Sequence, residues 1–425
     1  MSKRNIYTPD GVRDILNDEC YAKRNLEQKI RELFRKGGYR ELETSSIEFY
    51  DVFSNDIGLV SQESMFKFFD QQGRILVLKP DATIPAARVA ATKYSLQDFP
   101  LRLSYIGNTF RYNESGGGKQ REFTVAGVEI MGVAAPDADA EVIAMAAETI
   151  RCGGLENFQI DIGQINFFKG LMEESGLPEA DIENLRILID RKDFIGIEEL
   201  VRAHRLDSDI SKLILSLPKP IGNIDTLDRI QSMTRNVKSL EALENLHQVL
   251  DILDDYGLSK YISIDLGMVY DMTFYTGIIF KGYTYDLGFP ILRGGRYDSL
   301  VGKFGRDMPA TGFSLGVNML MTAMEKQGLL TEKITIDTAV TYTPEGRKTA
   351  FQLCSELRKQ GLVVEMDINN CSTGDFKKYA VSRGIGGFLN ILDENRIEVH
   401  NVKTGEVVLT TIDSLLENGG VGRKS

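Results

Sequence analysis

The chain of 425 residues exceeds the usual span of one hydrophobic core, so we expect two or three domains. Hydrophobic residues make up 42% of the sequence and charged residues 26%, the balance of an ordinary soluble globular protein. The net charge of −11 argues against nucleic acid as a main partner, because proteins that bind polyanions usually carry a basic surface. No apolar run reaches the ~20 residues of a membrane span, and the N-terminus lacks the apolar core of a secretion signal. The cytoplasm is therefore the expected location.

Cysteine and histidine give little support for metal binding or nucleophilic catalysis. The absence of CxxC spacing argues against a zinc site or a disulfide framework and favours buried or surface thiols. The three histidines neighbour no serine or cysteine motif. The four cysteines are Cys20, Cys152, Cys354 and Cys371. These residues indicate neither a bound metal nor a cofactor.

The first 165 residues predict a long helix, a set of strands and a second helix. A Pro-Asp-Gly turn precedes a helix over 14–35, which carries apolar residues at helical spacing and ends at Gly37-Gly38. A helix over 137–152 has acidic residues at its positive end. Between the two helices, the pattern predicts strands at 76–81, 101–112 and 122–132.

The sequence changes character after this region. Residues 165–255 show helical periodicity and few β-branched runs, which indicates a helical insertion. Strands resume over 261–270 and 277–289, and a helix follows near 316–327.

A hydrophilic joint at 328–337 precedes the last part of the chain. There, strands alternate with helices, which predicts an α/β domain of about 90 residues. We therefore expect a core at 1–327 that contains the insertion, and a C-terminal domain at 335–425.

Four sequence blocks resemble, in order, the motifs of the histidyl-tRNA synthetase family of class II aminoacyl-tRNA synthetases. The resemblance covers nearly the whole chain, since the C-terminal domain resembles that family's anticodon-binding domain. It implies an α+β fold, with a class II synthetase-like antiparallel sheet, flanking helices, the helical insertion and the C-terminal α/β domain. The blocks are LKPDAT at 78–83, TFRYNESGGGKQREFTVAGVEIMG at 109–132, LGMVYDMTFYTGIIF at 266–280 and GGRYDSLVGKFGRDMPATGFSLGVNML at 294–320.

The departures from the family's motifs concern the groups that activate the amino acid. The activating arginine of the family falls on Tyr270, and the arginine that clamps ATP falls on Met319. A motif 2 glutamate falls on Asn113, a motif 2 glutamine on Val125 and the motif 1 proline on Ser45. Adenylate formation needs cations where phosphate charge develops, and one such donor typically contributes ~3 kcal/mol. We therefore expect negligible aminoacylation and no catalytic residue in this chain.

Three residues of the first two blocks are candidates for binding the α-amino and carboxylate groups of an amino acid. Asp81 and Thr83 lie in a loop before a helix, where both residue types also favour capping. The resemblance adds a role for Asp81 as partner of a histidine ammonium group, and the two roles can coexist. Arg111 ends an apolar strand, and its guanidinium geometry suits a carboxylate; a structural salt bridge is the alternative.

Glu129, Tyr275 and Tyr270 are candidates for contacting the side chain of the same ligand. Glu129 alternates with Val128 and Ile130, so it faces away from them, either toward an imidazole N–H in a pocket or toward solvent. Tyr275 matches a family tyrosine near the imidazole, and its hydroxyl needs a partner if buried. Tyr270 takes the place of a charged group, where it would cap the pocket.

A chain that keeps the residues for binding an amino acid but lacks the ATP-binding arginine resembles the regulatory subunits of short-form ATP phosphoribosyltransferase, which derive from the synthetase. This resemblance implies a non-catalytic subunit in the first step of histidine biosynthesis, with the short catalytic subunit as partner and L-histidine as feedback ligand. It also implies self-association, as a dimer or higher, through the class II core.

Two alternatives to this regulatory role are a diverged histidyl-tRNA synthetase and a tRNA-sensing paralogue. Arginines at positions 270 and 319 would favour the first, and neither is present. A basic face on 335–425 would favour the second, but acidic residues are mixed among the lysines there. Binding to tRNA is therefore not expected.

Overall fold

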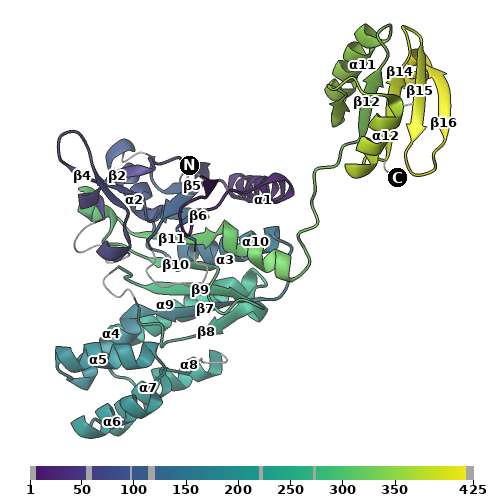
Figure 1. The fold of residues 1–425 in the computed structure, drawn as a ribbon. Helices are drawn as coiled ribbons and strands as arrows, with labels where there is room; N and C mark the ends of the chain where they lie inside the picture. The colour runs from purple at the N-terminus through teal and green to yellow at the C-terminus, as the bar shows by residue number, and fades with distance from the viewer. Residues whose placement is uncertain are drawn as a thin grey trace. The chain divides into compact units, whose positions relative to one another are not determined.

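The computed structural model describes residues 6–53, 60–95, 98–112, 120–219, 224–270 and 274–417. The chain divides into two compact units, Met1–Thr331 and Glu332–Ser425. Each unit combines a β-sheet with helices (Figure 1). No helix in the described ranges is long and apolar enough to cross a membrane.

The first unit is built on a mostly antiparallel sheet, to which the described residues contribute eight strands. The strand order is β1-β5-β6-β11-β10-β9-β7-β8, and the pairs at the two edges, β1 with β5 and β7 with β8, are parallel. The strands are β1 Arg40–Glu41, β5 Leu101–Phe110, β6 Glu122–Met131, β7 Phe158–Gln164, β8 Ile262–Ile264, β9 Ile278–Thr284, β10 Leu292–Arg296 and β11 Ala310–Gly316.

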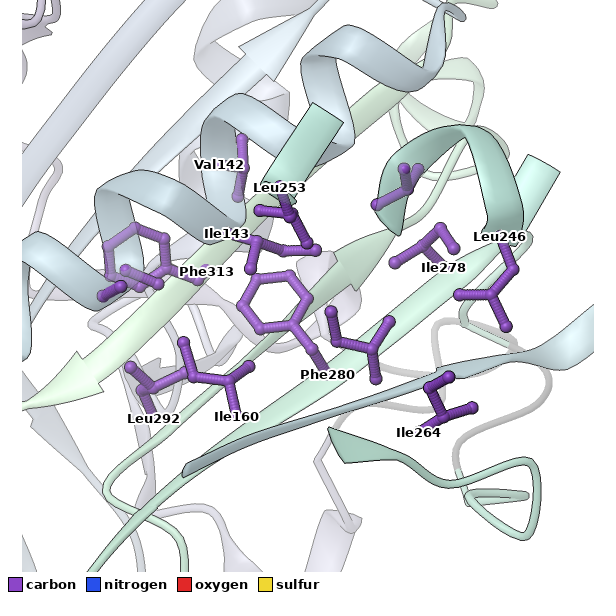
Figure 2. Packing of buried hydrophobic residues seen from close by; sticks show 14 of the residues in the cluster. Val142, Ile143, Ile160, Leu246, Leu253, Ile264, Ile278, Phe280, Leu292 and Phe313 are labelled. Carbon is purple, nitrogen blue, oxygen red and sulfur yellow. The ribbon is translucent and has the colours of Figure 1, made fainter. Parts of the chain in front are cut away.

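Helices cover one face of this sheet and form the main core with it. Ile160 of β7 and Phe280 of β9 are fully buried, and they point toward Ile143 and Leu253 of the covering helices (Figure 2). Burying one such side chain stabilises the fold by roughly 1.5–3 kcal/mol. The helices around this core are α1 Asn17–Lys36, α3 Pro136–Cys152, α9 Val237–Asp255 and α10 Val317–Lys326.

Most boundaries agree with the sequence pattern to within three residues, but two predicted strands are shorter. The strand expected over 277–289 is β9, which ends at Thr284. The helices expected over 14–35 and 137–152 are α1 and α3. The strand expected over 261–270 ends at Ile264, because the next residue forms a turn: the Asp265 carboxylate accepts the backbone N–H of Gly267 at 2.9 Å.

A second, smaller sheet has the strand order β2-β4-β3, and the sequence analysis predicted only part of it. The strand expected over 76–81 is β4, which ends at Leu78. The backbone then turns into α2, Thr83–Lys93, whose start carries Asp81 and Thr83. The strands are β2 Ile47–Phe49, β3 Lys67–Phe69 and β4 Ile75–Leu78.

The predicted helical insertion is a run of short helices that ends with α9. Several of these helices are capped by the side chain that precedes them, as the choice of Asp and Asn there favours. Asp193 accepts the N–H of Gly196 at 3.0 Å, and Asn236 accepts that of Ser239 at 3.1 Å. The helices before α9 are α4 Ile165–Ser175, α5 Glu179–Asp190, α6 Phe194–His204, α7 Ser208–Ser216 and α8 Ile224–Gln231.

The second unit is the predicted C-terminal α/β domain, with a mixed sheet in the order β13-β12-β14-β15-β16. Strand β12 pairs in parallel with β13 and β14, whereas β15 and β16 extend the sheet in antiparallel fashion. The fold class expected from the sequence is thus confirmed. The elements are β12 Thr338–Tyr342, α11 Arg347–Lys359, β13 Val364–Met366, α12 Thr373–Ser382, β14 Gly387–Ile391, β15 Arg396–Asn401, β16 Val407–Thr411 and α13 Ile412–Glu417.

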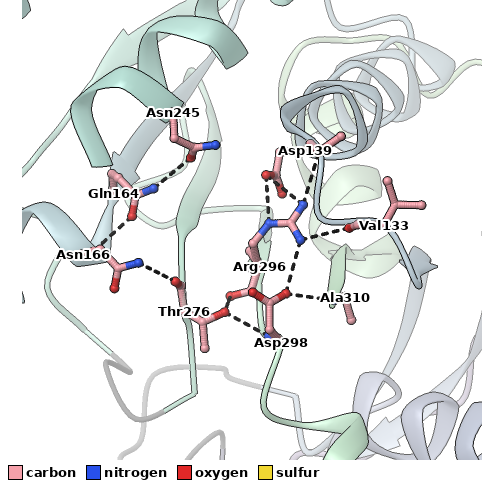
Figure 3. A network of polar contacts seen from close by, with 10 residues as sticks. Val133, Asp139, Gln164, Asn166, Asn245, Thr276, Arg296, Asp298 and Ala310 are labelled. Atoms are coloured by element: carbon pink, nitrogen blue, oxygen red, sulfur yellow. Dashed lines mark hydrogen bonds and ion pairs between the residues drawn. The ribbon is translucent and has the colours of Figure 1, made fainter. Parts of the chain in front are cut away.

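A buried ion pair joins β10 to the start of α3. Arg296 donates from Nε to Asp139 at 3.0 Å, and its Nη1 reaches the Val133 carbonyl at 3.1 Å and Asp298 at 3.2 Å (Figure 3). Asp139 is fully buried and Arg296 nearly so. Burial raises the pKa of Asp139, and the charge of Arg296 opposes that rise.

Arg296→Met should destabilise the first unit by ~3–5 kcal/mol, because it leaves the Asp139 carboxylate buried without its partner. The double variant Arg296→Met/Asp139→Leu should recover much of this loss. Urea unfolding followed by circular dichroism measures both. Arg35→Met is the matched control, since Arg35 pairs with Glu32 on the exposed face of α1, and it should change stability little. Equal effects of Arg296→Met and Arg35→Met on the free energy of unfolding would contradict the expected contribution of the buried pair to stability.

Candidate functional site

The candidate site residues lie on the face of the central sheet opposite the main core. Glu129 on β6 pairs with Gly312 of β11, and Gly312 pairs in turn with Gly295 of β10. A Cβ on Gly312 would lie 1.6 Å from a carboxylate oxygen of Glu129, and one on Gly295 would lie 2.8 Å from the ring of Tyr275. The glycines therefore leave the space above the sheet to Glu129 and Tyr275.

Glu129 is fully buried and accepts hydrogen bonds from two tyrosines, so it does not face solvent. The Tyr105 hydroxyl donates to one carboxylate oxygen at 3.0 Å, and the Tyr297 hydroxyl donates to the other. Burial raises the pKa of Glu129 to about 8, although these hydrogen bonds oppose the rise. The carboxyl is therefore mainly protonated at neutral pH. Because the carboxyl has no exposed surface, a ligand could bond Glu129 only if the surrounding side chains moved.

Asp81 and Arg111 form a second charged group near this cluster. Asp81 is 7% exposed and caps α2 by accepting the Ile84 N–H at 3.0 Å, so the expected capping role is present. Burial raises the pKa of Asp81, while the positive charge of Arg111 opposes that rise. Arg111 lies 3.9 Å from the Asp81 carboxylate and donates to the Pro80 carbonyl at 2.8 Å. The guanidinium thus adjoins Asp81 without a close bidentate pair between them.

Thr83 links the two groups, and the two candidate tyrosines lie on the other side of Glu129. The hydroxyls of Thr83 and Tyr105 are 3.2 Å apart. Tyr275 is 6% exposed, and its ring meets that of Tyr270 edge-on, with centroids 6.3 Å apart. The Tyr270 ring also lies beside Lys281, whose Nζ is 3.4 Å from the centre of the ring.

The positions that depart from the synthetase motifs carry side chains that neither bear charge nor resemble the groups they replace. Val125 is 6% exposed and belongs to the core cluster beneath α2. Met319 lies in the first turn of α10 and is 36% exposed. Ser45 accepts the backbone N–H of Ile47 at 3.2 Å. Asn113 lies outside the described residues.

Sequence reasoning missed Tyr105 and Tyr297, the two residues that hold Glu129. Tyr297 stands in the GGRYD block, and its ring stacks on Phe274 with centroids 5.3 Å apart. On β5, the residues two positions before and after Tyr105 share its face of the sheet, and this period of two is the one signal that the sequence offers. Their convergence depends on strand register, which no local pattern reveals.

The clustered groups can bind a small zwitterion that carries a hydrogen-bonding side chain. Arg111 offers a guanidinium for a carboxylate, Asp81 a carboxylate for an ammonium group, and Glu129 an acceptor or donor according to its protonation. The central antiparallel sheet and its flanking helices define a class II synthetase-like fold.

Comparisons with known proteins agree with this class. A sequence model of the family described as Histidyl-tRNA synthetase matches residues 11–320. A structure of histidyl-tRNA synthetase from Nostoc sp. superposes with a TM-score of 0.80 at 22% identity, over 97% of this chain and 98% of that one, and so supports the fold.

Relatives with higher sequence identity identify a narrower family within this class. A protein of Acetivibrio thermocellus named ATP phosphoribosyltransferase regulatory subunit is 59% identical over 98% of this chain and 100% of its own length. One from Ruminiclostridium cellulolyticum with the same name is 49% identical over the same shares. A Bacillus halodurans structure, described as an ATP phosphoribosyltransferase regulatory subunit/histidyl-tRNA synthetase, has a TM-score of 0.81 at 31% identity and covers 91% of this chain and 98% of that one. The chain belongs to this histidyl-tRNA synthetase-like family of ATP phosphoribosyltransferase regulatory subunits.

Glu129→Gln should change how stability depends on pH. Between about pH 4.5 and 8, Glu129 is protonated in the folded protein but ionised in the unfolded chain, so folding takes up a proton. The contribution of Glu129 to the free energy of unfolding therefore falls as pH rises through this window. The glutamine variant lacks this loss and should gain on the wild type by up to ~4 kcal/mol from pH 5 to 8, at ~1.4 kcal/mol per pH unit.

Urea unfolding of both proteins at pH 5, 6.5 and 8 measures this difference. Glu141→Gln is the control, because Arg102 lowers the pKa of Glu141 and its stabilising effect is lost only as pH falls through the acidic range. That control should show no slope between pH 5 and 8. A difference between Glu129→Gln and wild type that stays constant over this range would contradict the burial argument.

Proposed function

We propose that this chain is a non-catalytic regulatory subunit that activates the short catalytic subunit of ATP phosphoribosyltransferase and mediates feedback by histidine. The names of its relatives support the regulatory role. The proposal rests on one observation. The sequence has Asp81, Arg111 and Glu129 at motif positions that recognise the amino acid, but it has Tyr270 and Met319 at the positions of the motif arginines. Groups that recognise an amino acid remain, whereas uncharged side chains stand where the synthetase motifs place cations.

The alternative of a working synthetase is disfavoured by the same positions. Adenylate formation requires positive charge on the phosphates, and each missing donor typically removes ~3 kcal/mol of transition-state stabilisation. Tyr270 and Met319 supply no such charge. Histidine-dependent exchange between ATP and pyrophosphate by the pure chain would favour the synthetase instead.

Histidine would bind with its ammonium group at Asp81 and its carboxylate at Arg111. Thr83 would hold the position of Tyr105 beside the ligand, through the contact of their hydroxyls at 3.2 Å. The imidazole would exchange a hydrogen bond with Glu129 and pack against Tyr275, which Tyr270 supports from behind. A protonated Glu129 can donate to the neutral imidazole, and an ionised one can accept from it.

Self-association would use the small sheet of the first unit. Ile47 and Phe49 project from one face of β2 and are 46% and 45% exposed, so two large apolar side chains lie close together on the surface. A second copy of the chain that covers this face would remove them from water. Light scattering gives the mass in solution, and a monomeric mass at micromolar concentration would exclude this proposal.

Mixing the pure chain with the short catalytic subunit should produce a complex and raise the rate of ATP phosphoribosylation. Size-exclusion chromatography with light scattering detects the complex, and a coupled assay measures the rate. The chain alone should show no phosphoribosyltransferase activity. Separate elution and an unchanged rate would contradict the assignment.

Arg111→Gln should weaken histidine binding by about 10- to 150-fold, because it removes a charge-assisted hydrogen bond worth ~1.5–3 kcal/mol. It should also blunt inhibition of the complex by histidine without preventing assembly. Calorimetric titration measures the affinity. Arg102→Gln is the matched control, since Arg102 lies on β5 and pairs with Glu141 at 2.6 Å, away from the site. Equal histidine affinity in Arg111→Gln and wild type would place the histidine site elsewhere.

A further inference from the structure

Strand β16 forms one edge of the C-terminal sheet, and no other strand in the described part of the chain pairs with its outer side. Figure 1 shows this strand at the edge of the second unit. Val407, Val408 and Leu409 are 49%, 49% and 61% exposed, so three consecutive apolar side chains face water. A free strand edge of this kind is a template for pairing with another chain.

Three other edge strands of the described sheets carry charged residues, which discourage such pairing. Strand β13, at the opposite edge of the same sheet, contains Glu365. In the first unit, the edge strands β1 and β3 contain Arg40, Glu41 and Lys67. The sequence of β16 is VVLTT and contains no charge. The exposed edge of β16 therefore lacks the protection that these three edges have.

The backbone groups of every second residue of β16 point away from β15. Just before β16, Asn401 donates its N–H to the carbonyl of Glu406 at 2.9 Å, so these two residues form a hydrogen-bonded pair. Hydrogen-bonded and non-hydrogen-bonded pairs alternate along an antiparallel ladder. Val407, Leu409 and Thr411 therefore turn their N–H and C=O groups toward the outer edge.

A second copy of β16 fits this edge when it runs antiparallel, with Leu409 opposite its own counterpart. In this register Val407 lies opposite Thr411 and Val408 opposite Thr410, so every residue of the strand is paired and no charged residue enters the ladder. The outward residues of each copy supply the donors and acceptors that the other copy needs. A two-fold axis makes such a contact self-complementary.

The side chains also match across this junction, because directly opposite residues of an antiparallel pair share a face of the sheet. On one face, Val399 of β15 lies beside Val408, and the row would continue through Thr410 and Ile397 of the second copy. Pairs of β-branched side chains are favourable in strands. Ile397 belongs to the core cluster on this face and Val399 packs against it, so the contact would extend an apolar row from one copy into the other.

The distribution of charge permits two copies to meet at this unit. Residues 332–425 contain 12 Lys and Arg and 13 Asp and Glu, a net charge of −1, whereas the whole chain carries −11. Because like net charges repel, two copies of this acidic chain approach one another at least cost through the nearly neutral unit. The uncharged strand lies in that unit.

We propose that β16 is an interface between two copies of this chain, in which the strand pairs antiparallel with the same strand of a second copy around a two-fold axis at Leu409. The interface goes beyond the proposed regulatory function and does not depend on it. It is also separate from the small sheet of the first unit, which none of its residues belongs to.

Disulfide capture in the full chain tests the contact. In the proposed register the two Leu409 residues form a hydrogen-bonded pair with Cα atoms ~5.5 Å apart, within the ~4.4–6.8 Å that a disulfide spans. Under mild oxidation, Leu409→Cys should form a covalent dimer at least about tenfold faster than Val381→Cys. Val381 is the matched control, because it is 59% exposed on α12 of the same unit but lies away from β16. Equal rates for the two variants would overturn the proposal.

Charge substitutions then show whether the occupant of the edge is a second copy. Leu409→Lys and Leu409→Glu should each weaken self-association by at least about tenfold, because like charges would stand directly opposite each other. An equal mixture of the two variants should regain the affinity, since lysine would then face glutamate. Val381→Lys should associate like the wild type. Sedimentation velocity measures the affinities, and circular dichroism checks the folding.

Equal self-affinity of wild type and both charged variants would overturn the proposal and leave the small-sheet contact unaffected. A mixture that associates no more tightly than its components would also overturn it, because the edge would then pair with another chain segment and not with its own copy.

Discussion

The alternation of side chains along the antiparallel strands is the constraint on which both the core and the candidate site depend. On β6, Val128 and Ile130 face α3 and the main core, while Glu129 between them faces the opposite side. The same parity places Phe280 inward and Lys281 outward on β9. A shift of one residue in the register of either strand would exchange the two sets and put charges into the core.

The buried ion pair of Arg296 and Asp139 helps to fix this strand register. It ties β10 to α3, and Gly295 next to it brings the backbone close to Tyr275. Breaking an ion pair of this kind is costly, since it leaves a desolvated charge behind. Strand β10 and the helix that covers the core are thereby held in one arrangement.

How much the sequence predicts depends on the distance over which each signal acts. Periodicity located α1, α3 and the helical insertion, and alternation predicted that Glu129 faces away from Val128 and Ile130, without deciding between a pocket and solvent. Strands β2 and β3 of the small sheet were not predicted because each has only three residues, too few for a period of two to stand out. The partners of Glu129 escaped because Tyr105 and Tyr297 reach it from other strands, and only the strand register brings them together.

The closed hydrogen-bond cluster around Glu129 has a consequence for the rate of ligand capture. Glu129 has no exposed surface, and Tyr105 and Tyr297 occupy both of its oxygens. A ligand that requires this carboxyl could contact it only after the surrounding side chains have moved. The association rate of such a ligand would then depend on how often the cluster opens, because binding that requires a conformational change is slower than binding to a preformed site.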